Sequence, residues 1–221
     1  MSRGLLGCVV VAVIVIFLAV VIGVWFVGIR NHIVELDQAV AAQWAQVQND
    51  YQRRYDLIPN LVQTVQGAAN FEKSTLVEVT QARARVGQVS TGGGAPGATA
   101  ASIPNSPQAM QQYEQAQAGL SNALSRLLVV VEKYPELKSN ENFLQLQSQL
   151  EGTENRISVE RRRFNESAQA YNTYILKFPA SMVAGFSKFG KKEYFQGTAG
   201  SSEPPKVQFN FNPSAPATSG Q

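Results

Sequence analysis

The chain has 221 residues, a formal net charge of +3, one cysteine and one histidine. So small a charge does not favour a nucleic-acid partner, and a lone cysteine excludes an intrachain disulfide. His32 lies beside an apolar N-terminal run, so Ser–His and Cys–His nucleophiles and histidine-rich metal sites lack their residues in the rest of the chain. We therefore predict that the protein is not an enzyme and has no catalytic residue, metal or cofactor.

Residues 5–29 contain no charged residue. A helix needs about 20 apolar residues to cross the hydrocarbon core of a bilayer, and this run supplies them. A signal peptide has a shorter apolar region and a small-residue cleavage site, so residues 1–30 are predicted to be an uncleaved, single-pass anchor in the cell membrane. Arg3 and the terminal amine slightly outweigh Arg30, which predicts that the following domain lies outside the cytoplasm.

After the anchor, apolar residues recur at alternating gaps of four and three, which is typical of the buried seam of a bundle helix. The first seam consists of Val40, Trp44, Val47, Tyr51, Arg54, Ile58, Leu61 and Val65. A second seam of the same spacing runs from Phe143 to Phe178, and Pro179 ends it. These rows predict two long helices.

Two shorter helices are predicted between the long ones, over residues 71–89 and 107–134. Ser106 before Pro107 is a cap followed by a first-turn proline, and the short link after Tyr134 makes the last two helices antiparallel neighbours. We predict an all-α fold in which residues 31–186 form an antiparallel four-helix bundle.

Residues 187–221 have no helical period and a composition that predicts a largely disordered tail. Within it, the segment KVQFNF places Val207, Phe209 and Phe211 on one side of an extended chain. Such a segment could dock on the sheet edge of a partner or fold back on its own bundle, and both alternatives stay open.

The stretch RRYDLIPNLV, residues 53–62, puts a charge in the first seam at Arg54. The second seam likewise contains Thr153 and Glu160. Because a buried charge is costly unless it is paired, Arg54 is expected to meet a carboxylate, either Glu154 or Glu160.

Pro59 interrupts the same helix. A proline cannot donate to the carbonyl four residues earlier, so the Tyr55 carbonyl is free to accept from Arg53, Asn60 or another partner. Alternatively, Asp56 caps a restarted helix and Pro59 lies in its first turn.

The polar residues around these positions permit two interpretations. They form either a site for a ligand or peptide, or an internal network that fixes the register of the long helices, and we favour the network. The candidate residues are Arg53, Arg54, Asp56, Pro59, Asn60, Glu154, Asn155, Arg156 and Glu160.

Four stretches in order resemble the LemA family of bacterial membrane proteins. They are RRYDLIPNLVQTVQG, YPELKSNENFLQLQSQLEGTENRI, RRRFNESAQAYNTYILKFP and PKVQF, which begin at residues 53, 134, 161 and 205. The resemblance implies an N-terminal anchor followed by a helical bundle, and it assigns no reaction and no catalytic residue.

These observations predict a membrane-anchored scaffold or adaptor that binds other membrane or envelope proteins through its bundle surface or its tail. Self-association stays open. The alternative is a hydrolase or ligand-binding module built around Arg54, Asp56 and Glu154. A deep pocket lined by paired acids would favour the enzyme.

Overall fold

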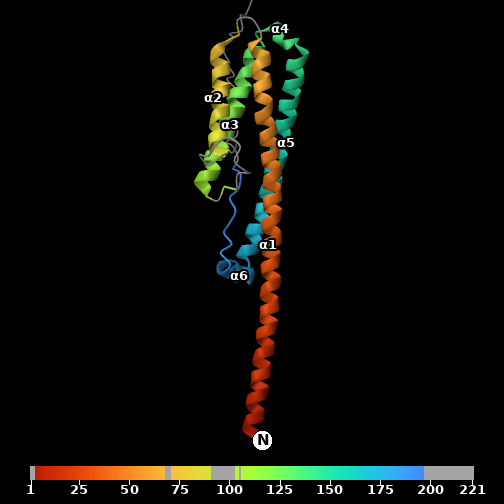
Figure 1. Cartoon of the computed structure of the whole chain (residues 1–221), viewed down its shortest axis with the longest axis vertical. Coiled ribbons are helices and arrows are strands. Elements are labelled where there is room, and N and C mark those ends of the chain that lie inside the picture. Colours follow the sequence, from red (N-terminus) through yellow and green to blue (C-terminus); the bar gives the residue numbers. More distant parts are fainter. Residues whose placement is uncertain (1–2, 68–70, 91–102, 105, 197–221) are drawn as a thin grey trace, which may run out of the picture.

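The computed structural model describes residues 3–67, 71–90, 103–104 and 106–196, with side chains from residue 10 onward. Within these residues the chain is helical and contains no strand, which confirms the all-α prediction (Figure 1). The helices are α1 Arg3–Gln66, α2 Lys73–Ser90, α3 Pro107–Val131, α4 Pro135–Lys138, α5 Glu141–Leu176 and α6 Ala180–Phe186.

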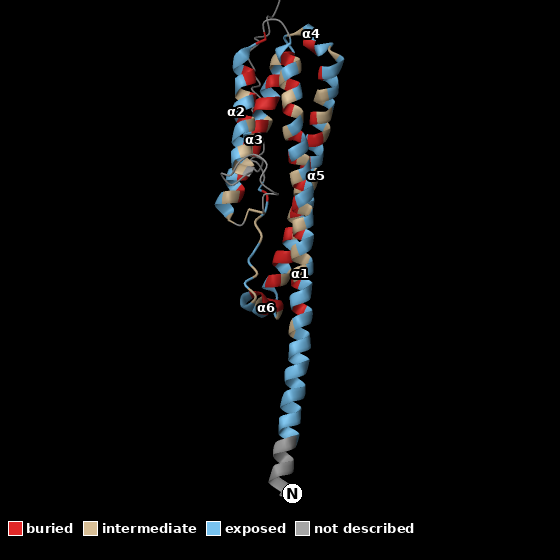
Figure 2. Ribbon diagram, viewed as in Figure 1, coloured by how far each residue is buried: buried red, intermediate tan, exposed pale blue. Residues whose placement is uncertain are grey.

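Helix α1 joins the apolar run to the bundle without a break. It has 64 residues, or about 96 Å at 1.5 Å per residue. The described part of the chain has one helix long and apolar enough to cross a membrane, and it is this one. The large apolar side chains from Val10 to Val27 are exposed except for that of Phe26, which is partly buried, and full burial begins at Ile29. Figure 2 shows the exposed N-terminal part of α1 projecting beyond the other helices.

Helices α1 and α5 run antiparallel along each other, with Arg54 paired to Glu154 and the Trp44 ring against Phe164. Helices α2 and α3 pack against each other and cover only the half of this pair farther from the apolar run (Figure 1). One buried cluster joins α1, α2, α3 and α5, and a second joins α1, α5, α6 and the start of α3. This arrangement is compatible with the predicted four-helix bundle.

Local signals place the helix ends. Ser106 caps α3 as predicted, accepting a hydrogen bond from the Ala109 N–H at 3.2 Å. Every residue of the first predicted seam is buried. The second seam ends earlier than predicted, because α5 stops at Leu176 and leaves Phe178 79% exposed. The chain then turns into α6.

Residues 187–196 differ from the predicted tail. They are not helical, but they run back along α5 toward the start of α3 (Figure 1), and Phe195 is buried in the second cluster. We call Gly190–Gln196 the strap. Val207, Phe209 and Phe211 lie outside the described residues.

Candidate functional site

The guanidinium of Arg54 connects three helices. Its side chain is only 2% exposed, and Nη1 donates to Glu154 on α5 at 2.7 Å and to Ser121 on α3 at 2.8 Å. Nη2 donates to Gln117 Oε1, also on α3. The Tyr51 ring lies 5.1 Å from the guanidinium carbon. The expected pairing of Arg54 with a carboxylate is confirmed, and Glu154 is the partner.

Glu160 does not join this cluster. It accepts from Arg163 on its own helix at 2.7 Å, about two turns from Glu154. Thr153 is fully buried and satisfies its hydroxyl by donating to the Gln149 carbonyl at 2.7 Å. Arg156 donates to that hydroxyl at 3.0 Å. The second seam therefore carries polar groups that are bonded within α5 itself.

The remaining predicted residues separate into two groups. Arg156 also reaches Asp50 on α1 at 3.4 Å and so helps to join α1 and α5. Arg53, Asp56, Asn60 and Asn155 are exposed on the helix surfaces and lie outside the Arg54 cluster. The structure thus brings only part of the predicted set together.

Pro59 leaves the Tyr55 carbonyl of α1 free to accept a hydrogen bond from α2. Helix α1 continues through Pro59, so Asp56 does not cap a restarted helix. The Tyr55 carbonyl instead accepts from Arg83 Nε at 3.3 Å, and the Arg83 guanidinium carbon lies 3.8 Å from the centroid of the Tyr55 ring. The partner of the freed carbonyl therefore comes from α2, and it tethers that helix to α1.

This tether predicts a coupling between Pro59 and Arg83. Arg83→Met should lower the free energy of unfolding by about 1–2 kcal/mol, because it removes a charged hydrogen bond and a cation–π contact. In a Pro59→Ala background, the new N–H at position 59 can bond to the Tyr55 carbonyl, so the same change should cost less. Denaturation in detergent of the unchanged chain, the two single variants and the double variant measures the difference between the two costs. Equal costs in both backgrounds would show that the proline plays no part in the tether.

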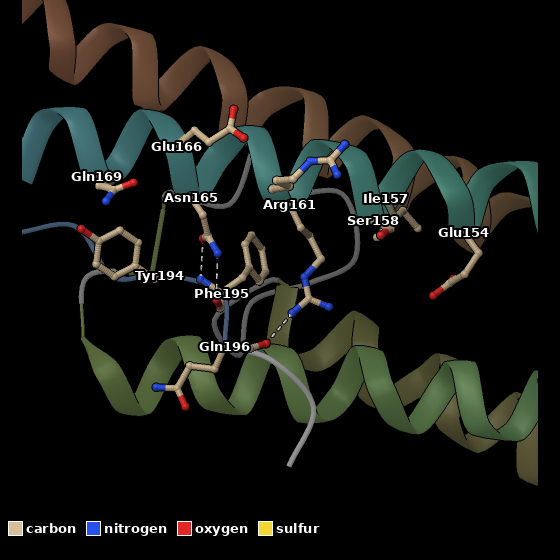
Figure 3. Close-up of a pocket in the computed structure, with 11 residues that line it drawn as sticks. Glu154, Ile157, Ser158, Arg161, Asn165, Glu166, Gln169, Tyr194, Phe195 and Gln196 are labelled. Carbon is tan, nitrogen blue, oxygen red and sulfur yellow. Dashed lines mark hydrogen bonds between the residues drawn. The ribbon is translucent and has the colours of Figure 1, made fainter. Parts of the chain in front are cut away.

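The strap is held by its peptide groups. The Asn172 side chain donates to the Lys192 carbonyl and accepts from the Lys192 N–H, both at 2.8 Å. Asn165, two turns earlier on α5, bonds in the same way to Phe195, at 2.9 and 2.8 Å (Figure 3). Each asparagine thus makes the pair of bonds that a neighbouring strand would make.

The end of the strap lies between α3 and α5. The Gln196 N–H donates to Glu114 of α3 at 2.7 Å, and Arg161 of α5 donates to the Gln196 carbonyl at 3.1 Å. Arg161 also pairs with Glu114 at 3.0 Å and lies over the Phe195 ring. The Phe195 ring itself packs on Trp44 and Phe164. Sequence reasoning missed these contacts, although Asn165 and Asn172 are seven residues apart and therefore share a face of α5.

A groove follows α5 and passes the end of the strap. One part, about 800 Å³, is lined by α5 and the strap (Figure 3), and another, about 360 Å³, lies between α3 and α5. We call the two parts together the α5 groove, because they share Glu154, Ile157, Arg161 and Gln196. Arg54 lines the part between α3 and α5, and its Nε is buried without a hydrogen-bond partner in the described structure.

The lining of the α5 groove balances charge. Its cations are Arg54, Arg161 and Arg162, and its anions are Glu114, Glu154 and Glu166. The rest is rich in side-chain amides. Within the described residues, no group of three or more His, Cys, Asp or Glu side chains could hold a metal ion. Such a lining suits hydrogen bonding to an uncharged polar molecule.

The buried tyrosines near the groove are neutral hydrogen-bonding groups. Burial, with a smaller contribution from Asp37, raises the pKa of Tyr171 to about 12. Burial also raises the pKa of Tyr51 and of Tyr113. The Tyr171 hydroxyl donates to the Gly190 carbonyl at 3.0 Å, at the start of the strap. These phenols stay protonated near neutral pH and serve packing and hydrogen bonding.

Several known proteins are similar to this chain. Magnetosome protein MamQ 2 of Paramagnetospirillum magneticum is 38% identical over 81 residues, which make up 37% of this chain and 30% of that protein. Magnetosome protein MamQ of Magnetospirillum gryphiswaldense is 39% identical over 80 residues, or 36% and 29%. The chain therefore matches less than a third of the length of these relatives. Protein LemA of Metamycoplasma hominis is 23% identical over 173 residues, or 77% of this chain and 71% of that protein.

The family comparison covers more of the chain. A model of the LemA family matches residues 43–209, which include the last part of α1, all of the helices after it and the strap. Together with the apolar N-terminal helix, these relatives indicate a membrane-associated helical protein. Because the match covers well over half of the sequence, the chain belongs to the LemA family.

Proposed function

We propose that this protein is a membrane-anchored, non-catalytic scaffold that binds extended segments of other membrane or envelope proteins in the α5 groove. One observation carries the proposal. The bundle already binds an extended peptide, its own strap, whose peptide groups bond to two asparagine side chains of α5. The buried Phe195 ring and the Lys192–Asp37 ion pair add side-chain contacts. Recognition of the main chain tolerates many sequences, as it does where peptides add to sheet edges.

The groove offers further bonds of the same kind beyond Gln196. Gln111, Gln115 and Asn122 of α3 line it, and side-chain amides both donate and accept. Its charges balance, so an uncharged extended segment meets no penalty for unmatched charge.

Continuity of α1 fixes where this groove is presented. Tyr51 lines the groove and lies 22 residues after Ile29, where burial begins, which corresponds to about 33 Å along the helix. A rigid helix would hold the groove at that height above the membrane surface. We place the bundle outside the cytoplasm, because Arg3 and the terminal amine slightly outweigh Arg30. A reporter that works only in the cytoplasm, fused after Gln221, should therefore be inactive. Activity of this reporter would show that the bundle lies in the cytoplasm.

A photo-crosslinking residue at Gln115 in the full chain, in native membranes, tests the scaffold. Distinct adducts with other proteins should form there and not at Gln81, which is exposed on α2. Ala118→Trp should abolish the adducts at an unchanged melting temperature, because Ala118 lines the groove. Ala84→Trp, at an exposed position on α2, is the matched control.

Two results would contradict the proposal. Adducts that survive Ala118→Trp unchanged would show that partners bind elsewhere on the bundle. Adducts formed only within the chain itself would show that the groove receives the protein's own segment after Gln196 rather than a partner.

A further inference from the structure

Large apolar side chains are exposed where α5 gives way to α6, beginning with Leu176 at the end of α5, which is 58% exposed. Phe178, Met182 and Phe186 are 79%, 56% and 77% exposed. Met182 and Phe186 are four residues apart and so lie on one face of α6, while Ala180, Val183 and Ala184 on the other face are buried. We call Phe178, Met182 and Phe186 the apolar foot. Exposed aromatic clusters of this kind mark an interaction surface.

The antiparallel pairing of α1 and α5 gives the level of the foot along α1. Glu154 pairs with Arg54, and Tyr174 lies against His32 with ring centroids 4.6 Å apart. One turn beyond Tyr174 the chain is therefore level with Arg30 and Ile29. Those residues are the end of the uncharged run of residues 5–29.

Packing places α6 at the same level. Helix α6 contacts α1, and its buried residues share a cluster with Ile29 and Ile33, while Phe26 packs against that cluster from within the apolar run. Figure 2 shows α6 at the end of the bundle where the exposed part of α1 begins. A membrane that holds the apolar run would have its surface at α6.

The charges around the foot fit a lipid surface. Lys177, Lys188 and Lys191 are exposed and flank α6 on both sides. A short helix with an apolar exposed face and adjacent lysines is the pattern of an element that lies in the membrane interface, with cations at anionic headgroups. Phenylalanine and methionine on its outer face would otherwise stay in water at an energetic cost.

We infer that the apolar foot is a second membrane contact, which inserts into the boundary between lipid headgroups and acyl chains beside the spanning part of α1. It would fix the tilt of the bundle on the membrane, because two contacts rather than one helix then define its orientation. The inference rests on insertion of the apolar run into the membrane and does not depend on partner binding in the α5 groove.

Spin labels on the full chain test the inference. In a Cys8→Ser background, single cysteines replace Phe178, Met182 or Phe186, and the chain is reconstituted in vesicles of phosphatidylcholine and phosphatidylglycerol. The labels at these three positions should collide readily with oxygen and several-fold less with a water-soluble nickel chelate than a label at Val129. Val129 is 67% exposed on α3, far from the apolar run, and is the aqueous control.

A label at Val15, 58% exposed within the apolar run, reports whether the span itself is in lipid. If that label is in lipid and the foot labels meet the nickel chelate as freely as the Val129 label, the second contact is refuted while the anchor stands. A Val15 label exposed to the chelate would refute the anchor and the foot together. Foot labels shielded from both reagents and broadened by a neighbouring label would show that a second copy of the chain, not lipid, covers the foot.

Discussion

Glu154→Leu is expected to lower the free energy of unfolding by about 3 kcal/mol, more than Arg54→Met does. The asymmetry follows from burial. The Arg54 side chain is 2% exposed and Glu154 is 52% exposed, so removing the carboxylate leaves a buried cation without its counter-charge. Breaking a buried pair in this way costs about 3–5 kcal/mol, and partial exposure of Glu154 places the expectation at the lower end.

Arg54→Met removes the charge and roughly keeps the volume, and the released carboxylate can turn to water. We expect a cost of about 1–2 kcal/mol from the lost hydrogen bonds to Ser121 and Gln117. Thermal and denaturant unfolding of both variants in detergent measures the difference. The control is Glu78→Leu, which breaks the exposed pair with Arg126 and should cost less than about 1 kcal/mol. If Arg54→Met lowers the free energy of unfolding more than Glu154→Leu does, the guanidinium stabilises the protein by packing rather than as a paired charge.

Phe195→Ala should destabilise the protein by about 3–5 kcal/mol, the range for removing a buried phenylalanine ring. The ring is 5% exposed, and it packs against Trp44 and Phe164 in the second buried cluster. Without it the strap loses its only buried side chain among the described residues 190–196. Calorimetry or helicity measured against temperature in detergent would detect the loss.

Truncations separate the strap from the residues after Gln196. A chain that ends at Gln196 should melt close to the full chain, whereas a chain that ends at Lys188 should melt many degrees lower. Tyr194→Ala is the matched control, because that neighbouring ring is 40% exposed and its removal should change stability little. If Phe195→Ala and Tyr194→Ala melt alike, the strap does not form part of the core.

Much of the bundle could be predicted because helical periodicity is a local property. The spacing of apolar residues predicted the buried face of α1 and placed Arg54 in it, and the cost of an unpaired buried charge then limited its partner to two carboxylates. The choice between Glu154 and Glu160 needed the stagger of α5 against α1. That stagger is set by packing over the whole length of both helices, which no short stretch of sequence encodes.

The strap could not be predicted for a different reason. Its backbone bonds go to the side chains of Asn165 and Asn172, so residues 190–196 carry no periodic pattern of their own. A segment without helical period or strand alternation is indistinguishable by composition from a disordered tail. The tether from Arg83 to the Tyr55 carbonyl is similar: Pro59 showed that the carbonyl was free, but the donor came from another helix.

The most direct test of whether the Arg54 cluster is a structural network or the binding site itself uses the double variant Arg54→Met, Glu154→Gln. The variant removes both charges but keeps a polar side chain at position 154, in the lining of the groove. Crosslinking from Gln115 and a thermal melt are measured on the same preparation. We predict that the melting temperature falls no further than it does for Arg54→Met alone, and that the crosslinked partners are fully recovered. A native-like melting temperature with the partners lost would show that the Arg54 cluster is the binding site, in contradiction to its structural role.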